Sequence, residues 1–429
     1  APGPGVVKRR NKAAPKPTRA QIKAKLQEGY AEQCRRRFAV FVRHAFVNAL
    51  EPGTKLDWGW HLDAVADHCQ WVVEVWAMKR KAPEDYIAAV QNLLINIPPR
   101  SLKSKIVSIC LPAWCWLKFP EMTFFGLGVP KTALDNARAC LDLVQSSWYK
   151  SWFAPKWRVD EDQCAATDFA LCEDDGQGGK RKLGWRKGAG WMTGITGQGA
   201  DCLLPDDPHD ADDVHSDEKR QNVLDKWDNA IWNRVRDLRV SIRIEIMQRL
   251  REDDHAGHVI AKSKQDPVSP QWVHLKIPLR YRTIKRCTTP MPCDAQGRYK
   301  IDGKATWADP RTVDGECMDP VRFTPEVVAA ELLRLGPYGF SGQYDQDPEP
   351  IGGGIFKRTY WNWFRFDGVD PGPFERPEGC HKRSARVIKK RHRSSEWDFD
   401  FVAISMDAAF RDAKEEKKGL RSEVGLVVI

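Results

Sequence analysis

Short apolar segments alternate with amphipathic ones along the middle of the chain. Four segments have the length and apolar character of strands: 93–97, 123–129, 202–204 and 240–247. Three segments between them repeat apolar residues at helical spacing: 104–117, 131–148 and 216–235. The last strand segment, VSIRIEIM, alternates apolar and polar residues with a period of two. Strands that alternate with helices predict an α/β domain with a mainly parallel central sheet.

Several single residues predict where helices begin, bend or end. Ser216 precedes two acidic residues and should cap its helix. Pro112 should kink or shorten the helix that contains it. Thr324, Pro325 and Gly336 predict the cap, the first turn and the end of a further helix.

Outside this region the patterns are weaker. Helical periodicity runs over 20–49, and the segment 161–182 is polar and rich in glycine, which predicts an inserted hairpin or a loop. Three more segments have the pattern of strands: 273–279, 399–405 and 424–429. The last two could pair with each other as a hairpin.

Changes in composition divide the chain into five parts. They are a flexible basic arm (1–20), an α/β core with N-terminal helices (21–260), a subdomain or lid (261–365), a Pro/Gly-rich and basic linker (366–398) and the start of another domain (399–429). We expect a domain boundary near residue 395.

Charge and cysteine content narrow the classes of protein. Lys and Arg number 68 and Asp and Glu 58, a net charge of +10, which favours an anionic partner such as nucleic acid but equally fits a weakly basic soluble enzyme. The 12 cysteines lack the C-x2-C spacing of zinc or redox motifs, so we expect reduced thiols and an intracellular protein. No apolar stretch is long enough to span a membrane or to act as a signal peptide.

NIPPRSLKS, at 96–104, joins the first strand to the following helix and ends in Lys103 and Ser104. A phosphate-binding loop needs inward backbone N–H groups, a lysine for the outer phosphates and a hydroxyl for a magnesium ion. The usual motif also has two glycines, and here Ile97 and Leu102 occupy their positions. A left-handed backbone at Leu102 would cost about 1–2 kcal/mol. By itself the segment fits either a nucleotide site or an ordinary strand–turn–helix at the surface.

Two paired carboxylates follow the third strand. Asp206 and Asp207 are typical, in that order, of a magnesium ligand and of a group that activates the attacking water in a P-loop ATPase. The alternative is a surface turn, because Asp-Asp-Pro favours turns and Pro205 is unusual in a central strand. The spacing from Lys103 leaves room for an intervening strand and helix, which favours the ATPase interpretation.

The strand at 240–247 is followed by Gln248 and Arg249. A polar residue at the carboxyl end of a strand beside a nucleotide can sense the γ-phosphate, and Gln248 is our candidate. Arg249 is either part of this motif or an ordinary surface charge.

Five motifs resemble those of the large terminase subunit of tailed double-stranded DNA phages, in the order found in that family. They are PPRSLKS, TGQGAD-CLLPDDP, IMQRLREDD, FSGQYDQDPEPIGGGIFKRTYW and SMDAAFRD. The resemblance covers roughly Trp58 to the C-terminus, and a loop of the PPR-x-x-KS kind is common in the family. It implies a P-loop (ASCE-type) ATPase domain that drives DNA into a capsid, followed by the beginning of a ribonuclease-H-like nuclease domain.

The resemblance implies roles for individual residues. The ATP-binding segment would comprise Pro99, Arg100, Ser101, Leu102, Lys103 and Ser104. Lys103 would neutralise the β- and γ-phosphates, Ser104 would bind Mg2+, and Arg100 would lie near the γ-phosphate. Asp206 would be the second magnesium ligand and Asp207 the catalytic carboxylate, where many relatives have glutamate. Gln248 would belong to the motif that couples hydrolysis to movement.

Other residues resemble family features less closely. Trp60-His61 resembles the segment near the adenine, although such a pair is also typical of core packing, and we assign no metal to His61. Arginine fingers in such rings come from a neighbouring subunit. Arg138 and Arg186 are candidates, while Gln198 occupies a position where arginine is expected in many relatives.

The nuclease part is the least complete. Asp407 resembles the first metal-binding carboxylate of the fold, and cleavage by Mg2+ or Mn2+ needs several such carboxylates around two ions. Further acidic ligands are missing before residue 429, so we expect that this chain, as given, does not cut DNA.

The family resemblance also implies partners and a location. These are double-stranded DNA, a portal protein, a small terminase subunit and a homo-oligomeric ring, in the host cytoplasm with transient docking on a procapsid and without a membrane. The basic run at 381–393 either contacts DNA phosphates or is a solvated linker. The alternatives are another P-loop helicase or translocase on nucleic acid, and a non-enzymatic basic DNA-binding scaffold.

Overall fold

The computed structural model describes residues 18–81, 91–193, 197, 199–210, 212–265 and 271–349, and four short strands between 363 and 428. The chain divides after Ile351 into two compact units, and each is described by itself. The basic arm before residue 18, the linker around the basic run and Gln198 lie outside the described residues.

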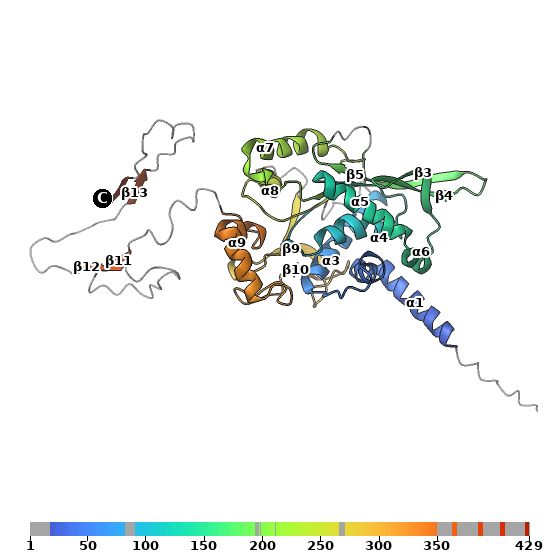
Figure 1. Ribbon diagram of the computed structural model, residues 1–429, viewed down its shortest axis with the longest axis horizontal. Coiled ribbons are helices and arrows are strands. Elements are labelled where there is room, and N and C mark those ends of the chain that lie inside the picture. Colours follow the sequence, from blue (N-terminus) through green and yellow to red (C-terminus); the bar gives the residue numbers. More distant parts are fainter. Residues whose placement is uncertain are drawn as a thin grey trace, which may run out of the picture. The chain divides into compact units, whose positions relative to one another are not determined.

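The first unit is built on a sheet of eight strands in the order β3-β4-β5-β2-β6-β7-β1-β8. Figure 1 labels β3, β4 and β5, which form one end of this sheet. The strands are β1 (Asn92–Asn96), β2 (Phe124–Gly128), β3 (Arg158–Ala165), β4 (Asp168–Asp174), β5 (Lys180–Gly190), β6 (Cys202–Asp206), β7 (Ile242–Met247) and β8 (Trp272–Lys276). All neighbours from β5 to β8 are parallel, whereas β3 and β4 join β5 as antiparallel strands. The predicted α/β fold with a mainly parallel sheet is therefore confirmed.

Helices cover both faces of this sheet. Their bounds are α1 (Arg19–Arg36), α2 (Phe38–Ala45), α3 (Trp60–Lys81), α4 (Leu111–Cys115), α5 (Pro130–Gln145), α6 (Ser147–Phe153), α7 (Asp217–Lys226), α8 (His255–Gln265) and α9 (Pro325–Gln343). Short π-helical turns are η1 (Phe46–Leu50), η2 (Lys105–Cys110) and η4 (Trp227–Ile231), and 3-10 turns are η3 (Asp213–His215) and η5 (Thr283–Lys285). A hairpin of β9 (Thr288–Cys293) and β10 (Ala305–Ala308) completes the unit.

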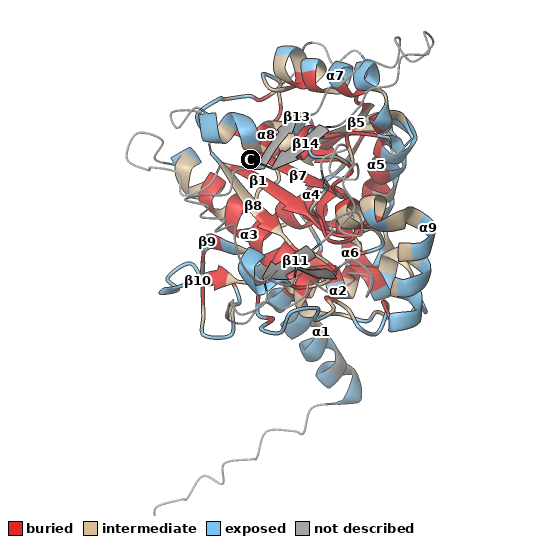
Figure 2. Ribbon diagram, turned by 90° about the vertical axis from the view of Figure 1, so that its left-hand side faces the viewer, coloured by how far each residue is buried: buried red, intermediate tan, exposed pale blue. Residues whose placement is uncertain are grey.

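Successive residues of β1 point to the two faces. Leu93 and Ile95 join the larger apolar core with α2, α3 and α5, whereas Leu94 joins a second core with Trp227 and Val259 from η4 and α8. The strands in the middle of the molecule are accordingly buried, while the outer faces of the helices are exposed (Figure 2).

The strand predicted at 240–247 is buried on both of its faces, whereas its alternating pattern is typical of a strand with one exposed face. Its polar residues Arg243 and Glu245 are 0% exposed, because they lie on the face covered by α8 and the turns beside it. Arg243 donates to Trp232 O, and Glu245 pairs with His255. Alternate residues of this strand therefore point to two buried faces of the sheet. One face is apolar, and the other contains paired polar groups.

Pro205 occupies the middle of β6, a central strand. It lies opposite Leu127 of β2, and pairing with β7 is found at Cys202, Leu203 and Asp206 but is interrupted at Pro205. Proline has no backbone N–H to donate, and Pro205 lies where the hydrogen bonding between β6 and β7 is irregular. The sequence did not predict this irregularity.

Several predicted helices are shorter or bent. The helix expected over 20–49 breaks at Arg37, whose extended backbone places its guanidinium 3.1 Å from Asp67 Oδ1. The helix expected over 216–235 ends with η4, and Ser216 caps it by accepting from Lys219 N. Gly336 has a φ of +68° and interrupts α9 where the end was predicted, but the helix resumes to Gln343.

The segment at 161–182 is a hairpin rather than a loop, since β3, β4 and the start of β5 form three antiparallel strands there.

β8 joins the main sheet beside β1, so the segment expected to form a subdomain begins as part of the core. None of the helices in the described ranges is both long enough and apolar enough to cross a membrane.

The second unit is described only as strand backbones. β11 (Trp363–Phe366) pairs in parallel with β12 (Ala385–Ile388), and β13 (Ile404–Asp407) pairs antiparallel with β14 (Gly425–Val428). The predicted pairing of the last two strands is confirmed, with Asp407 at the end of β13.

Candidate active site

The loop after β1 adopts two left-handed backbone conformations. Arg100 has a φ of 63° and Leu102 a φ of 58°. Leucine therefore adopts a conformation that glycine adopts without strain, at a cost of about 1–2 kcal/mol. Ser101 Oγ donates to Pro98 O at 2.7 Å, which ties the loop to its own start. The helix then begins at Lys103, and Ile106 N donates to Leu102 O at 3.0 Å.

Lys103 is buried beside the end of β6. Its ammonium lies 2.8 Å from Asp207 Oδ1 and 2.7 Å from Asp207 Oδ2. Asp207 itself has a φ of 42°, a conformation that aspartate adopts more readily than most residues. Its N–H donates to Ile246 O at 2.9 Å, which fixes the residue to the neighbouring strand β7.

Asp206 is the most enclosed group of the site, with 2% of its surface exposed. Its Oδ1 accepts from Ser104 Oγ at 3.0 Å. Its Oδ2 accepts from Ser108 Oγ at 2.7 Å and from Asn136 Nδ2 at 2.9 Å. Burial, and then the charge of Asp207, raise the pKa of Asp206 to about 6, against the opposing effects of Lys103 and the two hydroxyls.

Gln248 lies between the loop and the paired carboxylates, because β7 is between β1 and β6 in the sheet. Its backbone N–H donates to Asp207 Oδ1 at 3.1 Å. Its side-chain Oε1 is buried and has no hydrogen-bond partner among the described residues.

Five of the predicted residues therefore meet at the carboxyl edge of the parallel strands: Lys103, Ser104, Asp206, Asp207 and Gln248. The loop residues Pro99, Ser101 and Leu102 form the bend, whereas the side chain of Arg100 is exposed. Asp407 belongs to the second unit, and its side chain lies outside the described residues.

Ser104 and Asp206 have the chemistry of a magnesium site. A hydroxyl and a carboxylate are hard oxygen donors, and Mg2+ usually binds through one or two such groups and keeps several waters. The described residues contain no cluster of three or more His, Cys, Asp or Glu side chains that could hold a metal by itself. The donor set therefore fits magnesium that arrives with a nucleotide.

A hollow beside the loop is formed by the start of α3 and by the segment that precedes α9. Its lining includes His61, Arg100, Leu102, Asp319 and Arg322. His61 is 2% exposed, and its burial lowers its pKa to about 4. Arg322 donates to Arg100 O, so the segment before α9 contacts the loop directly.

The two arginine-finger candidates differ in position. Arg186 is 0% exposed, so it cannot reach into the site of a neighbouring subunit from where it lies, and this interpretation was wrong. Arg138 is exposed on α5 and stays a candidate. Gln198 lies outside the described residues.

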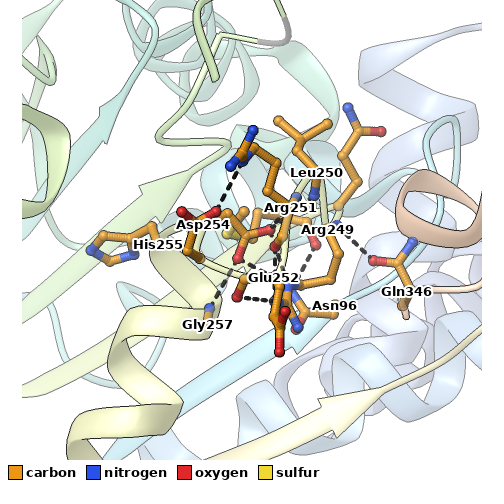
Figure 3. A network of polar contacts seen from close by, with 12 residues as sticks. Asn96, Arg249, Leu250, Arg251, Glu252, Asp254, His255, Gly257 and Gln346 are labelled. Carbon is orange, nitrogen blue, oxygen red and sulfur yellow. Dashed lines mark hydrogen bonds and ion pairs between the residues drawn. The ribbon is translucent and has the colours of Figure 1, made fainter. Parts of the chain in front are cut away.

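Arg249 is not a surface charge (Figure 3). Its Nε lies 2.9 Å from Asp254 Oδ1, and its Nη2 donates to the carbonyls of Arg251 and Glu252. Its N–H donates to Gln346 Oε1 at 2.9 Å, which connects the end of β7 to the segment after α9. The motifs around Gln248 and Gln346 are thus in contact.

Three residues of the site were not predicted: Ser108, Asn136 and Arg322. Ser108 follows Ser104 by one helical turn, and this spacing could have indicated it. Asn136 and Arg322 come from distant parts of the chain, and no local pattern marks them.

No family model and no curated protein matches this chain. Among solved structures, a mutant of the Thermus phage P74-26 large terminase ATPase domain aligns with 12% identity and a TM-score of 0.37, over 64% of this chain and 93% of that chain. The same ATPase domain in another structure aligns with 12% identity and a TM-score of 0.34, over 59% and 87%.

A large terminase from another thermophilic bacteriophage also aligns. The identity is 12% and the TM-score 0.30, over 48% of this chain and 44% of that one. This chain is a mixed α/β protein with a mostly parallel central sheet.

Proposed function

We propose that this chain is the ATPase motor of a phage large terminase, which uses ATP to move double-stranded DNA into a capsid. One observation carries the proposal: a lysine, a hydroxyl and two adjacent carboxylates from separate elements converge within hydrogen-bonding distance at one edge of a parallel sheet. Ligands of open α/β sheets bind at this edge. The motif order supports the assignment to terminases.

In the proposed reaction each group takes part in one step of hydrolysis. Lys103 binds the outer phosphates, and in doing so it exchanges the carboxylate of Asp207 for phosphate oxygens. Asp207, once free, orients the attacking water and accepts its proton. Mg2+, held by Ser104 and Asp206, would neutralise charge on the phosphates.

Gln248 would report the state of the nucleotide to the rest of the unit. Its side-chain oxygen is buried without a partner among the described residues, and its backbone N–H donates to Asp207 Oδ1. The N–H of its neighbour Arg249 donates to Gln346. Loss of the γ-phosphate can thus reach the segment after α9 through two adjacent residues.

The hollow beside the loop is filled by its own lining side chains, His61, Leu102 and Arg322 among them, and has no room for a purine.

Partners and the nuclease are parts of the same proposal. Double-stranded DNA, a portal protein, a small terminase subunit and further copies in a ring would act with this chain in the host cytoplasm. Asp407, at the end of β13, would be the first ligand of a nuclease metal, Mg2+ or Mn2+.

The proposal is tested by ATP hydrolysis, with and without double-stranded DNA, in wild type and in Lys103→Ala and Asp206→Ala. Both substitutions should abolish turnover. Lys156→Ala and Asp302→Ala remove exposed charges that belong neither to the loop nor to the paired carboxylates, and should leave turnover unchanged. Intact turnover in both site variants would overturn the assignment.

The alternatives are distinguished by further readouts. A helicase would separate the strands of a forked duplex in an ATP-dependent manner, whereas the proposed motor would move along an intact duplex and displace a bound third strand. A basic scaffold would bind DNA without any hydrolysis of ATP.

A further inference from the structure

Asn136 contacts the enclosed carboxylate of the site from a helix that carries no other residue of it. Its Nδ2 lies 2.9 Å from Asp206 Oδ2, and 70 positions separate the two residues in the chain. Asn136 is 8% exposed and Asp206 is 2% exposed, so water does not compete for this contact. α5 packs on β2 and β5, the strands next to β6 and beyond it.

The chemistry of the two groups fixes the direction of the bond. An ionised carboxylate only accepts hydrogen bonds, so the NH2 group of Asn136 must face Asp206. Asp206 Oδ2 then has two donors, Ser108 and Asn136, and Oδ1 has Ser104. The two donors on Oδ2 hold the carboxylate plane and leave Oδ1 directed at the loop hydroxyl.

The buried guanidinium of Arg186 contacts Ser108, one of the two donors to Asp206 Oδ2. Arg186 is 0% exposed, forms no ion pair with any described residue, and donates from Nη2 to Ser108 O at 2.8 Å. Gly126 provides the space, because a Cβ there would lie 3.1 Å from Arg186 Nη2. Ser108 is therefore held through its main chain while its hydroxyl holds Asp206.

We propose that Asn136 is a positioning residue for Asp206 that keeps Oδ1 aligned with Ser104 for a divalent cation. The inference rests on the proposed function. It predicts a specific effect on the cation, since partners of a metal-binding carboxylate commonly change metal affinity by about 10- to 100-fold when they are removed.

The test uses two substitutions at this position and one elsewhere. Asn136→Asp keeps the shape but replaces the donor by an acceptor, and Asn136→Ala removes the side chain. Asn222→Ala, at an exposed asparagine of α7, is the matched control. Mn2+ binding is measured by electron paramagnetic resonance with a non-hydrolysable ATP analogue, and binding of a fluorescent ATP analogue is measured in EDTA.

Both Asn136 variants should weaken Mn2+ binding about tenfold or more, while metal-free nucleotide binding stays within about twofold of wild type. The control should match wild type in both. Unchanged Mn2+ binding in folded variants would overturn the inference but not the proposed function. Equal loss of metal and metal-free nucleotide binding would show a merely structural role and overturn it too. A wild-type chain that binds no nucleotide would overturn both.

Discussion

Lys103 Nζ lies within 2.8 Å of both carboxylate oxygens of Asp207, although 104 positions separate the two residues. The pair joins the loop after β1 to the end of β6, across the intervening strand β7. A phosphate bound in the loop would compete with Asp207 for the same ammonium group. In the proposed function, binding of the nucleotide and release of the carboxylate are therefore one exchange of partners.

This exchange predicts the behaviour of Asp207→Asn. The amide has the shape of the carboxylate but cannot accept a proton, so turnover should fall by about 10²- to 10⁴-fold. ATP should bind as tightly as in wild type or more tightly, because Lys103 no longer has a charged partner. Steady-state hydrolysis and binding of a fluorescent ATP analogue measure the two effects.

Asp210→Asn is the control for this substitution, since Asp210 is an exposed carboxylate close by in the chain. It should leave turnover unchanged. A value for Asp207→Asn within about tenfold of wild type would contradict the role of Asp207 as the catalytic base.

The Leu102→Gly variant should be more stable towards unfolding than the Leu102→Ala variant. Both substitutions remove the leucine side chain, but only glycine adopts a φ of 58° without strain. The free energy of unfolding of Leu102→Gly should exceed that of Leu102→Ala by about 1 kcal/mol, measured by urea denaturation. An equal or lower value for the glycine variant would show that the loop is not strained at this residue.

Local patterns in the sequence were sufficient for most of the sheet. Five of the six parallel strands, β1, β2, β6, β7 and β8, were predicted within a few residues, because each is short, apolar and followed by turn residues. β5 was missed, since KRKLGWRKGAG is basic and rich in glycine. Its place is fixed by pairing with β2 on one side and β4 on the other, which is tertiary information.

The site was predictable where sheet geometry alone determines it. The loop, the paired carboxylates and Gln248 each follow a parallel strand, and the carboxyl ends of such strands meet at one edge. The contact of Asn136 with Asp206 and the burial of Arg186 could not be predicted, because both depend on which helix and strand pack behind Asp206. The burial of Arg249 likewise depends on Asp254, which folds back onto it.

The ion pair between Arg249 and Asp254 should be important for stability. Arg249→Ala leaves a carboxylate that is 0% exposed without its charged partner, so the free energy of unfolding should fall by about 3–5 kcal/mol. Arg239→Ala removes an exposed arginine that pairs with Asp237 and should cost less than about 1 kcal/mol. Urea denaturation compares the two, and similar losses would show that the buried pair of Arg249 and Asp254 (Figure 3) contributes no more than an exposed pair.

Arg322 should contribute to nucleotide affinity. Its guanidinium donates to Arg100 O and adds positive charge beside the loop that we propose to bind the phosphates. Arg322→Ala should raise the KM for ATP about fivefold, equivalent to ~1 kcal/mol, with little change in kcat. Arg298→Ala, an exposed arginine paired with Asp294, should change neither constant. A lower kcat at unchanged KM would assign Arg322 to the chemical step instead.

His68 should make the fold sensitive to acid. Its ring is fully buried, with Nδ1 2.7 Å from Ala64 O and Nε2 2.7 Å from Thr289 Oγ1, and burial lowers its pKa from 6.5 to about 4. Below pH 6.5 the unfolded chain binds a proton at this residue that the folded chain does not accept. Stability from His68 is therefore complete above pH 6.5 and is lost as the pH falls towards 4.

His68→Gln removes this titration but not the size of the side chain. At pH 7 the variant should have a lower free energy of unfolding than wild type. This difference should shrink by about 3 kcal/mol between pH 7 and pH 4, since each pH unit contributes about 1.4 kcal/mol per proton. His215→Gln, at an exposed histidine, should follow wild type at every pH. The comparison uses urea denaturation at matched ionic strength, so other buried histidines cancel in the difference. A deficit that is constant with pH would mean that His68 is protonated in the folded chain as readily as in the unfolded one.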